Sequence, residues 1–176
     1  MSSELNNSKL LDFLEELDKE LDGKITVVAV GGTAMTLLGI KPSTIDVDFN
    51  MPGEDFEKFK RILGMIPHGF KVDTYKDGVV FSQILPADYI AKSMLVKTKL
   101  KNITLKALSP IDIIVTKIGR LDGRDKDDIE ACIRKFQITK NQIIKRAKQI
   151  QYVGREENYE INLNHVLKKS FMVDEK

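Results

Sequence analysis

The feature that most constrains this chain is the stretch at residues 28–50, which reads as a strand, a glycine turn, a short helix and a second strand. A β-branched, apolar run over residues 25–30 ends at Gly31 and Gly32, and a brief helical pattern begins at Thr33. A strand that turns through glycines into a helix exposes backbone N–H groups at the positive end of that helix. We therefore expect Gly31, Gly32 and the hydroxyl of Thr33 to bind an anion such as a phosphate.

Two acids follow on the second strand of this stretch. In residues 45–49 the apolar residues alternate with Asp46 and Asp48. Side chains two apart in a strand share a face, so the two carboxylates are expected to point the same way, while Ile45, Val47 and Phe49 point into a core. Adjacent carboxylates repel each other, and a hard divalent cation such as Mg²⁺ or Mn²⁺ relieves that repulsion. The sequence therefore predicts a metal-bound nucleoside triphosphate beside Asp46 and Asp48.

This arrangement resembles the signature of the nucleotidyltransferase superfamily, which has the polymerase-beta-like fold. The signature is a hydrophobic residue, then Gly-Gly or Gly-Ser, a spacer, and then Asp-x-Asp or Asp-x-Glu. Here Val30 precedes the glycines, and residues 33–45 separate Gly32 from Asp46. The chain is most similar to the small prokaryotic members, including those related to abortive-infection toxins.

The resemblance also implies a third carboxylate on a neighbouring strand. In small members it often lies in a hydrophobic-Asp-hydrophobic-hydrophobic segment shortly before a proline, and residues 81–86 match that segment with Gln83 in place of the acid. An amide can orient a water or substrate, but it is a poor general base. Asp73, on the preceding predicted strand, and Asp88, just beyond the proline, are the alternatives. The sequence leaves the choice among these three residues open.

A second part of the resemblance begins at Ser109, where a Ser-Pro pair predicts a helix start. Small nucleotidyltransferases often continue with a lysine and then an Arg-x-Lys-Asp segment, which here gives Lys117, Arg124, Lys126 and Asp127. The resemblance implies that Lys117 and Arg124 bind phosphate, because metal ions neutralise only part of a triphosphate's charge. Asp127 would cap the helix or hold a basic neighbour. The alternative for these residues is a surface ion-pair network.

The patterns as a whole predict an α+β fold, with a mixed β-sheet core, flanking helices and a helical C-terminal portion. We expect a nucleotidyltransferase-like core over residues 1–108 and a helical region packed on it over residues 109–176. The expected strands are residues 25–30, 45–49, 70–75, 79–85, 93–99 and 103–108. The expected helices are one capped by Ser8 and closed by Gly23, then 33–38, 54–63, one from Pro110, one through 127–136, one capped by Thr139, and 161–171.

The composition indicates where in the cell the protein is expected and whether it is expected to bind nucleic acid. The chain has one cysteine, Cys132, and no basic, apolar leader or apolar run of membrane-spanning length, so a cytoplasmic location is expected. The net charge of +2 is too small to indicate nucleic-acid binding by itself. However, residues 92–106 hold five basic residues without an acid, and residues 134–155 hold seven. These blocks either contact the phosphates of an RNA acceptor or form an ordinary solvated face.

The function that this resemblance implies is transfer of a nucleoside monophosphate from a nucleoside triphosphate to a hydroxyl, with Mg²⁺ or Mn²⁺. The acceptor would be RNA, a protein or a small molecule, and no membrane partner is expected. Because Gln83 stands at the expected acid position, a binding module of the same fold that does not react is one alternative. The toxin half of a toxin–antitoxin pair, with a partner antitoxin, is another.

Overall fold

The structure is a computed structural model that describes residues 4–171, and these form two compact units. The sheet unit comprises residues 4–78 and 87–108, and the helical unit comprises residues 79–86 and 109–171. The predicted α+β class is confirmed. The predicted division into residues 1–108 and 109–176 stays a prediction: in the structure residues 79–86 belong with the helical unit, and residues 1–3 and 172–176 lie outside the described chain.

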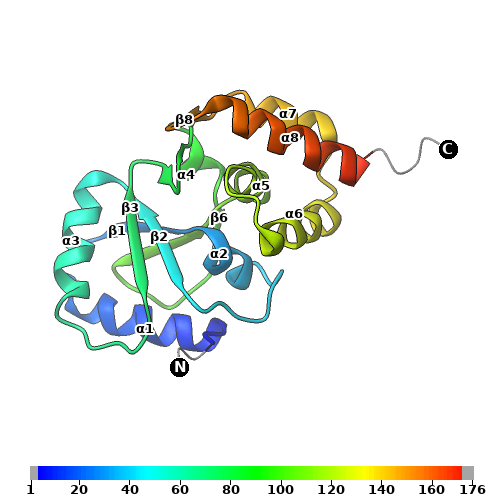
Figure 1. The fold of residues 1–176 in the computed structure, drawn as a ribbon. Coiled ribbons are helices and arrows are strands. Elements are labelled where there is room, and N and C mark those ends of the chain that lie inside the picture. Colours follow the sequence, from blue (N-terminus) through cyan, green and yellow to red (C-terminus); the bar gives the residue numbers. More distant parts are fainter. Residues whose placement is uncertain (1–3, 172–176) are drawn as a thin grey trace. The chain divides into compact units, whose positions relative to one another are not determined.

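A mixed five-stranded sheet with strand order β3-β2-β1-β7-β6 forms the centre of the sheet unit (Figure 1). Its strands are β1 (Ile25–Ala29), β2 (Val47–Met51), β3 (Val72–Lys76), β6 (Met94–Leu95) and β7 (Ile103–Ala107). The unit's helices are α1 (Asn7–Glu20), α2 (Gly31–Leu37), α3 (Gly53–Leu63) and α4 (Tyr89–Lys92). Strand β2 is parallel to β3 and β1 is parallel to β7, whereas β1–β2 and β6–β7 are antiparallel.

The core of the sheet unit comes from apolar side chains at the predicted spacings. Helix α1 buries Leu10, Leu14 and Leu17 and lies beside α3 (Figure 1). The rings of Phe49 on β2 and Phe59 on α3 meet edge to face, with 5.7 Å between their centroids. The cap of α1 differs from the prediction, because Asn6, rather than Ser8, accepts the N–H of Lys9.

Within the described residues, the helical unit contains the helices α5 to α8 and a small sheet with strand order β4-β5-β8. Its helices are α5 (Pro110–Ile118), α6 (Gly123–Phe136), α7 (Lys140–Ala147) and α8 (Glu156–Phe171). Its strands are β4 (Val79–Val80), β5 (Gln83–Ile84) and β8 (Gln151–Tyr152). Ser109 and Thr139 cap α5 and α7 as predicted, because their hydroxyls accept the N–H groups of Asp112 and Gln142. None of the helices within residues 4–171 is long and apolar enough to cross a bilayer.

Two predicted elements of this unit are different in the structure. The single strand expected at residues 79–85 is two short strands, because the chain turns at Phe81 with a φ of 54°. The last helix begins at Glu156 rather than at residue 161, so the break expected after Gly154 is shorter.

Candidate functional site

Two acids lie next to each other on neighbouring strands of the sheet unit. Strands β2 and β3 are parallel, and their register pairs Asp48 directly with Asp73. Asp46 lies in the bend just before β2 and is exposed, while Asp48 and Asp73 are half-buried. Ile45, in the same bend, is 38% exposed, so the prediction that it points into the core is wrong. The three carboxylates therefore come from one end of the β2–β3 pair.

Gly31 and Gly32 follow β1 as predicted, but they are the first two residues of α2 instead of a turn before it, and the local geometry requires both glycines. Gly31 has a φ of 54°, a backbone angle that residues with a Cβ rarely adopt. A Cβ built on Gly32 would lie 2.9 Å from the hydroxyl oxygen of Thr44, so the turn approaches the segment before β2 too closely for a side chain. Helix α2 has only seven residues. The predicted phosphate contacts of Gly31 and Gly32 stay a prediction.

Thr33 ties this turn to the acidic segment. Its side chain is fully buried, and its hydroxyl accepts the N–H of Asp48 at 2.9 Å and donates to the carbonyl of Asp46 at 3.4 Å. The N–H of Val30 also donates to the carbonyl of Asp48. The Thr33 hydroxyl was predicted to donate a hydrogen bond to a phosphate. In the structure it bonds instead to the backbone of Asp46 and Asp48. Thr33 instead positions Asp46 and Asp48.

The ammonium of Lys71 lies next to one of these carboxylates. Its Nζ is 3.3 Å from Oδ2 of Asp73. The hydrogen bond with Asp73 and the charge of Asp73 raise the pKa of Lys71, burial lowers it, and the charges of Asp46 and Asp48 add smaller increases than these. The charge of Lys71 therefore interacts with the charges of all three carboxylates, and most strongly with that of Asp73. Reasoning from the sequence gave Lys71 no role, although it stands two residues before Asp73 and directly ahead of β3.

The donor set of Asp46, Asp48 and Asp73 suits a hard divalent cation, because all its ligating atoms are carboxylate oxygens on adjoining segments. Within residues 4–171, however, no three histidine, cysteine or acidic side chains are placed so that together they could hold a metal ion. The ion pair with Lys71 is consistent with that finding, since it holds Asp73 on the ammonium. By the chemistry of their oxygen donors these residues would suit Mg²⁺ or Mn²⁺, and the binding of a metal here stays a prediction.

Gln83 does not belong to this acidic group. It lies on β5 in the helical unit and is 1% exposed. Its amide is 3.0 Å from the carbonyl oxygens of Thr116 and Val80, which suits donation by the amide nitrogen to both. A Cβ on Gly119 would overlap this amide, so Gln83 fills a close-packed position. The amide of Gln83 is therefore committed to backbone carbonyls of the helical unit, which argues against its predicted place at the third-carboxylate position.

Asp88, the other alternative for the third carboxylate, precedes α4 and has its carboxylate 3.9 Å from the ammonium of Lys92. Asp73 is the candidate whose strand adjoins β2. The signal that could have identified it was an acid in the predicted strand at residues 70–75, but its register against Asp48 was not readable from the sequence.

Lys117 is enclosed in an ion-pair network of the helical unit. It is 3% exposed, and its Nζ lies 3.2 Å from Asp125 and 3.0 Å from Asp128, both on α6. Arg120 binds Asp125 with two hydrogen bonds, of 2.7 and 2.8 Å. Burial by itself would raise the pKa of Asp125, but Arg120 and Lys117 outweigh it and lower that pKa to about 2. This placement argues against the predicted phosphate contact of Lys117, because its ammonium is held by carboxylates.

The start of α6 also differs from the prediction. Asp122, rather than Asp127, caps the helix: its carboxylate accepts the N–H of Asp125, and the carboxylate of Asp125 accepts the N–H of Asp122. Asp127 and Arg124 are exposed on α6. The predicted phosphate contact of Arg124 stays a prediction.

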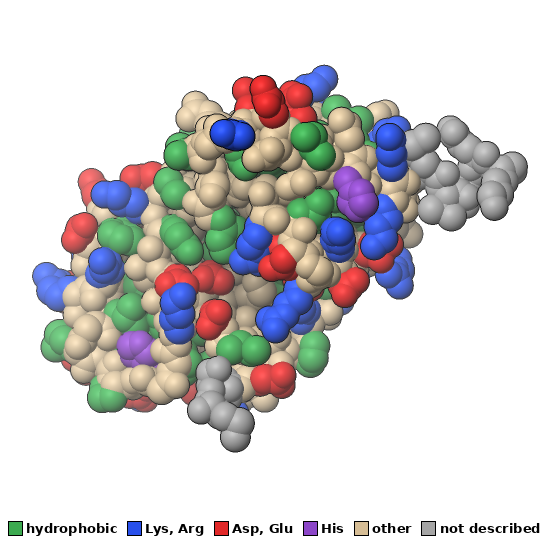
Figure 2. All heavy atoms as spheres, viewed as in Figure 1, with side chains coloured by type: hydrophobic (Ala, Val, Ile, Leu, Met, Phe, Trp, Pro, Cys, Tyr) green, Lys and Arg blue, Asp and Glu red, His purple; other side chains and the backbone are tan. Residues whose placement is uncertain are grey.

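Acidic and basic side chains are interspersed on the face seen in Figure 2. One member of the block at residues 134–155, Arg146, is only 5% exposed and makes a two-pronged ion pair with the buried carboxylate of Asp112. Arg146 therefore stabilises the helical unit instead of contacting an RNA.

Comparison with known proteins agrees with this geometry. A family model described as a nucleotidyltransferase of unknown function (DUF6036) matches residues 8–170, so the chain belongs to that family. The predicted superfamily is thereby confirmed. A solved structure, an antigenic nucleotidyltransferase-like protein from Paracoccidioides brasiliensis, is 16% identical with a TM-score of 0.54, and the match covers 95% of this chain and 91% of that chain. At that identity the likeness shows the fold. No curated protein matches the chain.

Proposed function

We propose that this protein transfers a nucleoside monophosphate from a nucleoside triphosphate to a hydroxyl acceptor and releases pyrophosphate. The observation that carries the proposal is the direct pairing of Asp48 with Asp73 on adjoining strands, with Asp46 beside them, in a chain of a nucleotidyltransferase family. Asp46 and Asp48 would hold Mg²⁺ or Mn²⁺. When bound, the ion neutralises phosphate charge and favours the ionised form of the attacking hydroxyl.

The protein's own groups have separate tasks in this proposal. The turn at Gly31 and Gly32 approaches the acidic segment closely, so the triphosphate would lie against its backbone. Thr33 keeps Asp46 and Asp48 in place through its two backbone hydrogen bonds. Lys117 has no task here, because its ammonium is already paired with Asp125 and Asp128.

Asp73 would accept the proton of the attacking hydroxyl. The acceptor oxygen bonds to the α-phosphorus, the bond from that phosphorus to the bridging oxygen breaks, and the electron pair leaves with pyrophosphate. The alternative of a module that binds nucleotide without reacting was based on the lack of a third carboxylate. Asp73 would supply that carboxylate. The proposal of an enzyme is therefore better supported than the binding module.

The test is a transfer assay with each of the four α-labelled nucleoside triphosphates, Mg²⁺ or Mn²⁺, and total tRNA or the protein itself as acceptor. Released pyrophosphate is measured in parallel, because it reports turnover whatever the acceptor. We expect Asp46→Asn combined with Asp48→Asn to abolish both signals, while a control pair on exposed acids, Asp12→Asn with Asp22→Asn, retains them. Unchanged turnover in the first pair would show that these acids do not hold the metal.

A further inference from the structure

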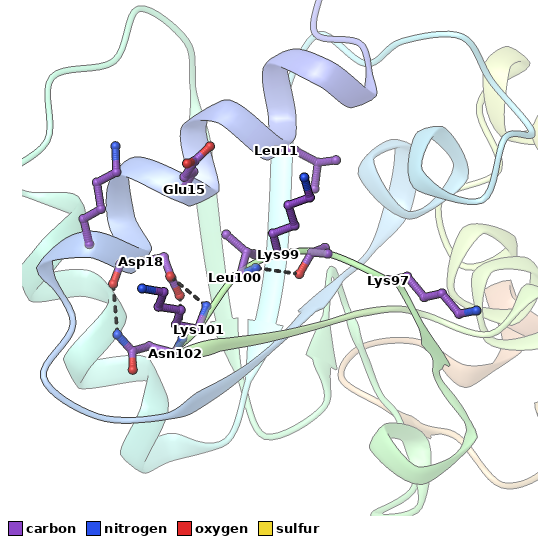
Figure 3. A pocket seen from close by; sticks show the side chains of 10 residues that line it. Leu11, Glu15, Asp18, Lys97, Lys99, Leu100, Lys101 and Asn102 are labelled. Atoms are coloured by element: carbon purple, nitrogen blue, oxygen red, sulfur yellow. Dashed lines mark hydrogen bonds between the residues drawn. The ribbon is translucent and has the colours of Figure 1, made fainter.

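A separate pocket in the sheet unit has the lining of an anion site. It has a volume of about 700 Å³ and lies between α1 and the segment at residues 97–102 (Figure 3). Leu11 on α1 and Leu100 give it apolar surface, and Lys99 extends from the segment towards α1 (Figure 3). Lys19 and Lys101 complete the basic lining, while Lys97 extends from the same segment away from α1.

The two acids of this pocket do not cancel its positive charge. The carboxylate of Asp18 is 7% exposed and accepts three backbone N–H groups, those of Lys101, Asn102 and Ile103, at 2.8–2.9 Å. These bonds occupy Asp18 and fix the end of the lysine-bearing segment against α1 (Figure 3). Glu15 is the other acid of the lining, and Lys19 makes an ion pair with Glu16 at 3.2 Å, so that Lys99 and Lys101 supply the positive charge nearest to the pocket's leucines. The side chains of Lys99 and Lys101 are exposed to solvent.

The pocket is distinct from the acidic site. It adjoins the start of β7, where Ile103 pairs with Ile25 at the start of β1. The acidic site adjoins the opposite end of β1, where the N–H of Val30 bonds to Asp48. A five-residue strand separates the two, which is about 15 Å at the usual rise per residue. A ligand in the pocket therefore does not occupy the place of the triphosphate.

We propose that this pocket binds a nucleotide unit, with the phosphate on Lys99 and Lys101 and the base against Leu11 and Leu100. Ammonium groups at the rim attract phosphate, and the leucines provide the apolar surface against which a base packs. The unit is part of a nucleic-acid strand or is a free nucleotide, since both carry this chemistry. The proposal goes beyond nucleotide transfer, because it concerns binding at a second place.

The experiment measures binding of a fluorescent 12-nucleotide single-stranded RNA by anisotropy, without metal or nucleoside triphosphate. We expect Lys99→Gln with Lys101→Gln to weaken binding about tenfold at low salt. The slope of log K against log salt should fall by about 1.4, because two phosphate contacts are lost. The matched control is Lys58→Gln with Lys60→Gln, which removes two exposed lysines on α3, and it should stay within about twofold of the wild type.

Further arms identify the source of the nucleotide. Competition by AMP that is lost in the pocket variant supports a free nucleotide, and RNA binding that AMP does not displace supports a strand. Leu100→Ala should weaken the binding of AMP and the binding of the RNA. Equal losses in the pocket and control variants, unchanged RNA binding in the pocket variant, or binding to phosphatidylglycerol vesicles with none to RNA or AMP would each overturn the proposal. Circular dichroism checks that all variants fold.

Discussion

Asp48 on β2 and Asp73 on β3 are direct register partners across two parallel strands of the sheet unit. Carboxylates at directly paired positions of neighbouring strands repel each other, and a cation between or beside them reduces that repulsion. The ammonium of Lys71, 3.3 Å from Asp73, is that cation in the structure. The pairing turns an Asp-x-Asp segment into a group of three acids, which is what the proposed transfer needs.

Replacing Lys71 should strengthen metal binding. In Lys71→Met the ammonium no longer competes with a divalent ion for Asp73, so we expect Mn²⁺ to bind about threefold more tightly at low salt, an effect of the size seen for exposed ion pairs. Electron paramagnetic resonance of free Mn²⁺ measures the affinity. Lys76→Met, which removes an exposed lysine at the last position of β3, is the control and should have little effect. Weaker Mn²⁺ binding in Lys71→Met would mean that Lys71 supports the site.

The local part of this site was readable from the sequence, and the long-range part was not. Gly31, Gly32, Asp46 and Asp48 are connected by one short helix, so their spacing indicates their proximity. Asp73 becomes their neighbour only through the parallel register of β3 against β2, which no local pattern encodes.

Residues 81–86 misled the prediction because a polar residue among apolar ones before a proline is a weak pattern. Gln83 satisfies that pattern, but it is buried in another sheet. Lys117 was likewise read as a phosphate ligand, because an exposed and a buried lysine look alike in a helical pattern. The structure shows that two carboxylates of α6 hold it.

Thr33→Val should destabilise the protein. Valine has nearly the same shape as threonine but leaves the N–H of Asp48 without the acceptor that it has at 2.9 Å. The loss of such a bond in a buried position costs about 1–2 kcal/mol. Urea unfolding measures the change, and Thr33→Ser, which keeps the hydroxyl, should recover most of it. A serine variant that is as unstable as the valine variant would assign the effect to packing instead.

The stability of the helical unit should depend on the charge of Asp125. Arg120 and Lys117 lower its pKa from 3.8 to about 2 in the folded protein, so the folded state binds this proton less readily than the unfolded state. The resulting stabilisation is complete above about pH 4 and is lost as the pH falls towards 2. It amounts to about 2 kcal/mol.

Asp125→Asn tests this dependence on pH. At pH 7 the variant should be less stable than the wild type by about 3 kcal/mol, because Lys117 and Arg120 lose a partner. The difference should shrink between pH 4 and pH 2.5 in urea unfolding followed by circular dichroism. Asp127→Asn, on an exposed position of the same helix, is the control. A difference that stays constant over this pH range would contradict the role given to Asp125.

The most direct test of the account is nucleotide transfer by Asp73→Asn beside Asp88→Asn, with pyrophosphate release as the readout. Both changes remove one carboxylate charge from the sheet unit, but only Asp73 is a register partner of Asp48. We expect Asp73→Asn to lower turnover about 100-fold or more, the usual contribution of a general base, and Asp88→Asn to stay within about twofold of the wild type. Full turnover in Asp73→Asn would contradict the account.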